Sequence, residues 1–177
     1  SRFNRRRKRL ADLILKLNER VSSFLNEGED IYLLDSIPIP ICRNARWTRS
    51  KICRDDFETA PDKGYSAVHR SWYYGFKLHL ATSLKGVYSS MDLTKASVHD
   101  IHFLKNIKHS GINNCELVGD KAYASKPIQT DLFTTQQIRL RAPSKSHQND
   151  KEHIPFIYLK ARKRIETVFA QLCDQLM

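Results

Sequence analysis

The chain has 177 residues, of which 41% are hydrophobic, and its 30 Lys and Arg outnumber 19 Asp and Glu to give a formal net charge of +11. That size fits one domain with its own core, and the positive charge favours a polyanionic partner such as nucleic acid. No apolar run approaches the roughly 18 residues that span a bilayer, so no membrane partner is expected. The chain opens on Ser1 and ends at Met177 inside a helical pattern, which predicts a piece of a longer protein with an incomplete C-terminus.

The first part of the chain predicts one helix followed by one strand. Apolar residues recur at helical spacing over 5–26, and Asn26-Glu27-Gly28 is expected to end this helix because glycine readily adopts the left-handed conformation. A strand is expected over 30–37. Pro38 and Pro40 should stop it, because proline cannot donate to a strand ladder.

The middle of the chain predicts a hairpin that follows an irregular region. Residues 41–68 are basic and have no clear period. Strands are expected over 72–81 and 87–93, joined by a turn at Ser83-Leu84-Lys85-Gly86.

The last third alternates between helices and strands. A capping-box-like start at 97–100 predicts a helix to about Lys108, with Asp100 only capping it, and Pro127 opens a short helix to about Phe133. Short strands are expected over 116–119 and 138–142. A final helix is predicted by the apolar stripe of Ile157, Ala161, Ile165, Val168, Phe169, Leu172 and Leu176. The whole pattern predicts one mixed α/β domain.

Three acidic residues stand on these elements. Asp35 and Asp120 each end a strand-like run, and Glu166 lies on the last helix. A small acidic cluster in a basic protein can hold hard divalent cations beside a phosphate backbone. Two such ions supply the chemistry of phosphodiester cleavage, so these carboxylates are predicted to be both metal ligands and catalytic groups.

Several motifs occur in an order that resembles the DDE transposases of bacterial insertion sequences. They are Leu34-Asp35-Ser36-Ile37-Pro38, Gly64-Tyr65 with Tyr73-Tyr74-Gly75-Phe76-Lys77-Leu78-His79, the segment 93–100, Gly119-Asp120-Lys121-Ala122-Tyr123, and Arg162-Lys163-Arg164-Ile165-Glu166-Thr167-Val168-Phe169. The sequence departs from the family at Ala122, where glycine is usual, at Leu159, where tyrosine is expected, and at Cys173, where lysine is expected.

The resemblance implies a ribonuclease H-like mixed sheet flanked by helices, with an N-terminal helix. It divides the chain into a basic helical segment, 1–28, and a catalytic domain, 29–177. The implied activity is metal-dependent DNA cleavage at transposon ends and strand transfer into target DNA, with two Mg²⁺ or Mn²⁺ ions. Asp35 would bridge both ions, and Asp120 and Glu166 would each hold one. The implied partners are double-stranded DNA and a second copy of the protein, in a homodimer on DNA.

The basic clusters are predicted to line a DNA groove. The expected DNA contacts are Arg43, Arg46, Arg49, Lys51, Lys77, Lys121, Tyr123, Arg162 and Arg164. A bacterial cytoplasm, in association with the nucleoid, is the expected location. Four cysteines without a CxxC pair are typical of such a reducing compartment.

Other interpretations remain open at this point. Taken singly, each aspartate could cap a turn, and Glu166 could form a surface ion pair with Arg162. His99 and His102 fit a helix start better than a metal site, and Trp47 and Trp72 fit packing better than stacking on a flipped base. The chain could also be a ribonuclease H-like nuclease or resolvase, or an inactive DNA-binding remnant.

Overall fold

The computed structural model describes residues 2–53, 55–143 and 155–176, and it confirms a mixed α/β fold. The helices are α1 (Arg2–Leu25), α2 (Phe103–Ile107), α3 (Lys126–Gln136), α4 (Phe156–Ala161) and α5 (Lys163–Leu176). The strands are β1 (Ile31–Arg43), β2 (Asp62–Ser66), β3 (Ser71–Ser83), β4 (Tyr88–Lys95), β5 (Glu116–Val118) and β6 (Arg139–Arg141). Three short 3₁₀ helices are η1 (Asn44–Arg49), η2 (Asp100–His102) and η3 (Lys121–Tyr123).

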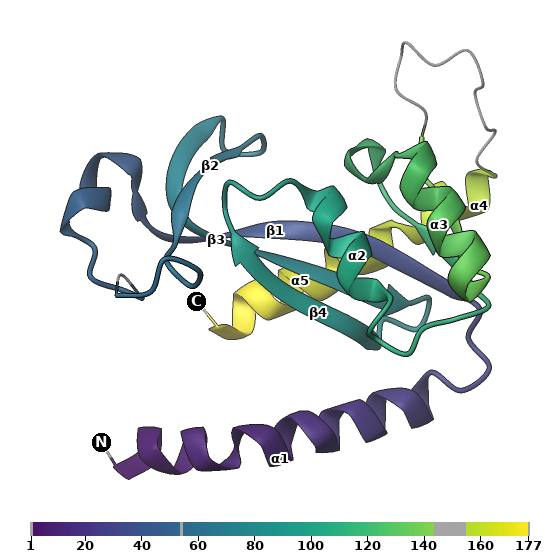
Figure 1. Cartoon of the computed structure of the whole chain (residues 1–177), viewed down its shortest axis with the longest axis horizontal. Helices are drawn as coiled ribbons and strands as arrows, with labels where there is room; N and C mark the ends of the chain where they lie inside the picture. Colours follow the sequence, from purple (N-terminus) through teal and green to yellow (C-terminus); the bar gives the residue numbers. More distant parts are fainter. Residues whose placement is uncertain (1, 54, 144–154, 177) are drawn as a thin grey trace.

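All six strands form one sheet in the order β2-β3-β1-β5-β6, with β4 also paired to β3 (Figure 1). The central strand β1 runs antiparallel to β3 and parallel to β5, and β5 runs parallel to β6. β2 pairs with the first part of β3 and β4 with the rest. An antiparallel hairpin start followed by alternating helices and parallel strands is the predicted ribonuclease H-like arrangement, which is therefore confirmed.

Helices cover both faces of the sheet. α2 and α3 lie on one face, where Phe103, Leu104 and Leu132 belong to the larger buried cluster. α5 crosses the opposite face, where Ile165 and Phe169 pack against strand residues in a second cluster (Figure 1). Fully burying each of these large side chains stabilises the fold by about 1.5–3 kcal/mol, so both helix layers are firmly attached.

The prediction that β1 stops at Pro38 is wrong, because the strand continues through Pro38 and Pro40 to Arg43. β5 pairs with β1 only as far as Leu33, so the rest of β1 is open on that side among the described residues. Alternate residues of a strand direct their N–H groups to opposite sides. Pro38 and Pro40, two residues apart, both face the open side, where no ladder hydrogen bond is lost.

In the middle of the chain, the prediction of an irregular region is partly wrong and the prediction of a hairpin turn is confirmed. The region 41–68 is not wholly irregular, because it contains the end of β1, η1 and β2. The turn between β3 and β4 is confirmed: the Ser83 N–H donates to the Val87 carbonyl at 2.9 Å, and the Gly86 N–H donates to the Ser83 carbonyl at 2.9 Å. Gly86 has φ +84°, which explains a glycine there.

The last helix is interrupted near Arg162 and forms two pieces, α4 and α5. Ile165 and Phe169 of the predicted apolar stripe are buried, but Ile157 is 69% exposed. Tyr158 packs against the α5 cluster instead. The stripe prediction is therefore correct for α5 and wrong for the start of α4.

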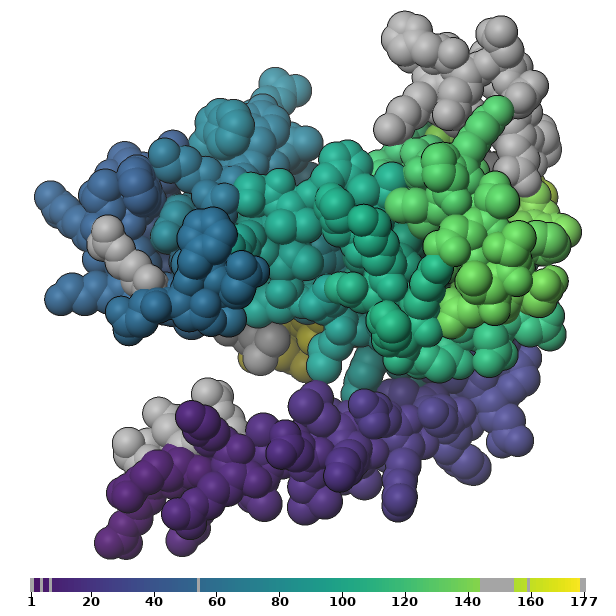
Figure 2. Space-filling model, viewed as in Figure 1, coloured from purple at the N-terminus to yellow at the C-terminus, as the bar shows by residue number. Residues whose placement is uncertain are grey.

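α1 confirms the predicted N-terminal helix and lies along one side of the domain (Figure 2). Its last turns contact the body through Ser22 and Asn26, both buried. The rest of the helix runs beside the body (Figure 2). Within the described residues, α1 and the other helices are too short or too polar to cross a membrane.

Candidate metal centre and nucleic-acid interface

Asp35 lies in the middle of β1 on the face of the sheet that α5 covers. Leu33 packs against α5, and side chains two residues apart on a strand share a face, so Asp35 points to the same side. Its Oδ1 accepts a hydrogen bond from the Ser36 N–H at 2.8 Å. The Ser36 N–H faces the open side of β1, as do the positions of Pro38 and Pro40, and the bond to Asp35 gives it a partner.

Asp120 follows β5, the strand that lies parallel to β1. Its Oδ1 accepts a hydrogen bond from the Ala122 N–H at 2.8 Å, which fixes the carboxylate at the start of η3. A Cβ at Gly119 would lie 2.9 Å from the Tyr123 ring, so glycine is needed where the chain turns from β5 into this segment. Because β5 pairs with β1 up to Leu33, Asp120 emerges beside Asp35.

The negative charge of Asp120 acts on Asp35. The pKa of Asp35 is raised from its ordinary value of 3.8 to about 6, chiefly by burial and also by the negative charges of Asp120 and Asp100. The Ser36 N–H and the guanidinium of Arg162 lower the same pKa. A carboxylate that is buried beside other acids binds a proton or a cation readily, because either one relieves the desolvation and the repulsion.

We expect this raised pKa to make the metal-free protein less stable as the pH rises from about 4 to about 6. Folded Asp35 keeps a proton that the unfolded chain has lost over that range, so ionisation costs about 3 kcal/mol by pH 7. Asp35→Asn should therefore stabilise the protein at pH 7.5 and not at pH 3.5. Urea unfolding of both proteins at the two pH values measures this difference. A constant difference would contradict the raised pKa.

Glu166 lies on the first turn of α5, four residues after Arg162, and its side chain is exposed. Its neighbour Ile165 is buried in the cluster that attaches α5 to β1. Among the residues that the structure describes, no group of three or more His, Cys, Asp or Glu side chains could hold a metal ion. The meeting of Glu166 with Asp35 and Asp120 therefore stays a prediction.

Asp100 has a different structural role from the predicted one. The sequence predicts that it only caps a helix, but the cap is His99, whose Nδ1 accepts from the Ile101 N–H at 3.3 Å. Asp100 accepts a hydrogen bond from Lys77 Nζ at 2.7 Å in a largely buried ion pair. Its charge also acts on Asp35. The sequence contained one signal for this pair. Lys77 lies on a predicted strand of the hairpin, and a lysine that faces the core of a protein needs an acidic partner there.

We expect Asp100→Asn to lower the free energy of unfolding by about 1.5–3 kcal/mol, because it weakens a charge-assisted bond and leaves the Lys77 ammonium group largely buried without its counter-ion. Chemical denaturation followed by circular dichroism measures this loss. Asp131→Asn is the matched control, because Asp131 pairs with Lys108 at an exposed position. The control should change stability by less than about 0.5 kcal/mol. Equal losses would show that the Lys77–Asp100 pair is not special.

Tyr123 cannot contact DNA in this structure, which corrects the prediction. It is fully buried in the larger core cluster, beside Ala81 and Phe103. Burial and the nearby charges of Asp100, Asp35 and Asp120 raise its pKa, so its hydroxyl stays protonated. Its neighbour Lys121 is exposed and remains a candidate DNA contact.

Two other predicted DNA contacts are engaged within the fold. Lys77 Nζ donates to the Val98 carbonyl at 2.9 Å as well as to Asp100. Arg164 donates to the Lys85 carbonyl from Nη2 at 2.6 Å, which joins α5 to the β3–β4 turn. Arg162 is half-buried, and its charge reaches Asp35. These side chains are placed to support the site, and the structure gives no direct support for phosphate contacts by Lys77 or Arg164.

The remaining basic residues form an exposed cluster at the far end of β1. Arg43 ends the strand, and Arg46, Arg49 and Lys51 follow it on or beside η1, all of them exposed. η1 itself is held by Trp47, whose ring packs 6.0 Å from Tyr74. The arginine cluster thus stands on a small, separately packed part of the molecule.

Both tryptophans pack against neighbouring side chains, as predicted, but both remain exposed. Trp47 lies under Lys63, whose Nζ is 4.4 Å from the ring centroid, in a cation–π contact. Trp72 packs edge-on against Tyr65 with ring centroids 5.4 Å apart, although it remains 60% exposed. His99 caps η2, and neither it nor His102 belongs to a metal-binding group among the described residues.

Comparisons with known proteins give the following similarities. A family model described as a transposase DDE domain matches residues 25–177. No curated protein shows significant similarity to the chain. Among solved structures, the chain is similar to one from the cryo-EM structure of the piggyBac transposase synaptic complex with hairpin DNA. That similarity has 12% identity and a TM-score of 0.46, and it covers 72% of this chain and 25% of that one.

Proposed function

Because this chain belongs to the transposase DDE domain family, we propose that it cleaves DNA at transposon ends and joins the freed 3′-hydroxyl to target DNA. The observation that carries the proposal is the pair of aspartates, Asp35 and Asp120, at adjacent parallel strands of a strongly basic protein. The catalytic domain would be residues 29–177, preceded by a basic helical segment, 1–28. A homodimer would act on DNA.

The residues present fit a pair of divalent cations. Asp35 and Asp120 offer hard carboxylate oxygens, and a cation beside Asp35 would offset the cost of burying its charge, which is the main cause of its raised pKa. Two Mg²⁺ or Mn²⁺ ions would activate the attacking oxygen and stabilise the leaving one. Asp35 would contact both ions and Asp120 one of them. Glu166 would complete the site from α5, and Arg162 would orient the carboxylate of Asp35.

The exposed arginines suggest where DNA would lie. Eight residues of β1 separate Asp35 from Arg43, which is about 26 Å at 3.3 Å per residue. This distance corresponds to roughly eight base pairs of B-DNA at 3.4 Å each. A duplex with its cleavage point at Asp35 and its axis along β1 would therefore bring its flank to Arg46, Arg49 and Lys51.

We expect DNA binding to fall steeply with salt, because several phosphates would be neutralised. Replacing Arg46, Arg49 and Lys51 together by glutamine should reduce the slope of log K against log salt by about 2 to 3, since each phosphate contact contributes about 0.9. Fluorescence anisotropy with a duplex at several salt concentrations measures the slope. Lys105→Gln is the control, because Lys105 is exposed on α2, on the opposite face of the sheet from α5. An unchanged slope in the triple variant would contradict this DNA path.

The reaction products distinguish the proposed function from its alternatives. The chain would be incubated with Mg²⁺ or Mn²⁺, a labelled duplex that carries the transposon ends, and supercoiled target DNA. A transposase yields joined products, in which the label enters the target plasmid. A nuclease or resolvase yields cut ends alone. An inactive remnant retains DNA and cuts nothing, and either of these last two results would overturn the proposal.

A further inference from the structure

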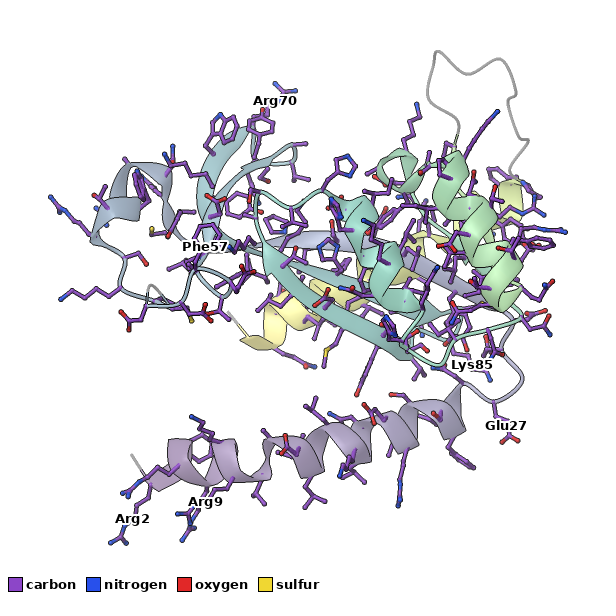
Figure 3. All side chains as sticks on the ribbon, in the orientation of Figure 1. Arg2, Arg9, Glu27, Phe57, Arg70 and Lys85 are labelled. Carbon is purple, nitrogen blue, oxygen red and sulfur yellow. The ribbon has the colours of Figure 1, made fainter. Side chains whose placement is uncertain are left out.

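Arg164, on the first turn of α5, holds the turn between β3 and β4. Its Nη2 and Nε both donate to the Lys85 carbonyl oxygen, at 2.6 and 3.3 Å. A Cβ at Gly86, the next residue of that turn, would lie 2.7 Å from Arg164 Nε, so the guanidinium group rests against this glycine. Figure 3 labels Lys85 at the end of the β3–β4 hairpin. Arg164 therefore joins α5 to a part of the sheet that is 79 positions away in the chain.

This contact restrains the first turn of α5 from the side. Ile165, the next residue, is fully buried against Leu33 and Val118, so it fixes how closely the helix approaches the sheet. The interruption near Arg162 separates α5 from α4, so the helix does not continue rigidly in that direction. Within the described part of the chain, the bonds of Arg164 are the side-chain hydrogen bonds that join this first turn to the sheet.

The flank that Arg164 occupies sets the direction of Glu166. Successive residues of an α-helix are about 100° apart, so Arg164 and Glu166 leave α5 about 200° apart, on opposite flanks of Ile165. In the sheet, β3 and β4 lie on one side of β1, and β5 lies on the other. Because Arg164 is held on the β3–β4 side, Glu166 faces the β5 side, where Asp120 follows the strand.

We propose that Arg164 is a positioning residue for the metal centre, because its contact with the β3–β4 turn fixes the rotation of α5 and directs Glu166 toward the cations of Asp35 and Asp120. This inference rests on the proposed function, and it gives Arg164 a role other than the phosphate contact that the sequence predicts. Removing a positive charge near an acidic site should by itself strengthen cation binding. Losing a positioning contact should weaken cation binding, so the two effects differ in sign.

Mn²⁺ titration of the full 177-residue chain, followed by electron paramagnetic resonance, measures cation affinity without DNA or catalysis. Arg164→Gln should weaken Mn²⁺ binding about tenfold, the lower end of the loss seen when a group that orients a metal ligand is removed. In a Glu166→Gln background the same substitution should cause no further loss. Lys163→Gln is the matched control, because Lys163 is exposed on the same turn of α5. It removes the same charge and should not weaken Mn²⁺ binding.

A substitution in the β3–β4 turn tests the same contact without changing α5. Gly86→Ala should displace the Arg164 guanidinium group and weaken Mn²⁺ binding severalfold, with no further loss in the Arg164→Gln background. Gly111→Ala is its matched control, because Gly86 and Gly111 have φ of +84° and +75°, but a Cβ at Gly111 would meet nothing within 4 Å. Gly111→Ala should impose similar backbone strain and leave the Mn²⁺ affinity unchanged.

The results of these titrations separate the positioning role from the function on which it rests. If Glu166→Gln weakens Mn²⁺ binding but Arg164→Gln leaves it unchanged or strengthens it, the positioning role alone is overturned. A further loss from Arg164→Gln in the Glu166→Gln background, or equal losses from Gly86→Ala and Gly111→Ala, would also overturn it. If the chain binds no Mn²⁺, or if Glu166→Gln leaves the affinity unchanged, the third ligand is wrong and the positioning role fails with it.

Discussion

Asp35→Asn, Asp120→Asn and Glu166→Gln should each reduce DNA cleavage to background while the protein still folds and retains DNA. Each substitution removes one ligand charge and nearly preserves the shape of the side chain. A reaction that depends on two positioned cations loses the position of the attacking or the leaving oxygen when one ligand is lost. Cleavage of a labelled duplex in Mg²⁺ or Mn²⁺, with anisotropy for DNA retention, measures both properties.

Asp174→Asn is the matched control for these variants. Asp174 is exposed on α5, the same helix as Glu166, and should be replaceable without loss of cleavage. Asp100→Asn is unsuitable as a control because Asp100 pairs with Lys77 and acts on Asp35. Normal cleavage by Glu166→Gln would show that the third ligand is misassigned. Glu152 would then be the next candidate, although it lies outside the residues that the structure describes.

Ile165→Ala should lower the free energy of unfolding by about 2–5 kcal/mol, because it leaves a cavity in a closed cluster. Ile165 is fully buried against Leu33 and Val118, next to Glu166. The loss should also loosen α5 from β1, so faster hydrogen exchange is expected in α5 than in the hairpin of β3 and β4. Urea unfolding and hydrogen exchange measure the two effects.

Ile157→Ala is the same substitution at a position that is 69% exposed on α4. It should change stability by less than about 0.5 kcal/mol, as exposed substitutions usually do. A similar loss in both variants would mean that α5 is not attached to the sheet through Ile165. The comparison also tests whether the part of the predicted apolar stripe on α4 contributes less to stability than the part on α5.

The sequence predicts the positions of α1, α3, α5 and the short strands β5 and β6 well, because these depend on local period and on turn residues. Ile165 and Phe169 are buried where the 3.6-residue period places them. The length of β1 could not be predicted in the same way. Whether Pro38 ends a strand depends on which side of it is paired, and this is decided by how far β5 extends in the folded sheet.

The candidate site is predictable to a similar extent. The aspartates Asp35 and Asp120 stand out because each follows a short apolar run, and the parallel pairing of β1 and β5 brings them together. The roles of Lys77 and Tyr123 are not visible in the sequence. Both belong to the motifs that resemble the family, but the Lys77 side chain points to Asp100 and the Tyr123 side chain points into the core. The direction in which these two side chains point is set by tertiary packing.

The central claim is that Asp35, Asp120 and Glu166 hold divalent cations together. Anomalous diffraction from crystals grown with Mn²⁺ tests it most directly, because it locates the metal and its ligands without relying on activity. We expect Mn²⁺ between Asp35 and Asp120, with α5 placing Glu166 on the same ions. Mn²⁺ bound elsewhere, or bound by the two aspartates with Glu166 still pointing into solvent, would contradict it.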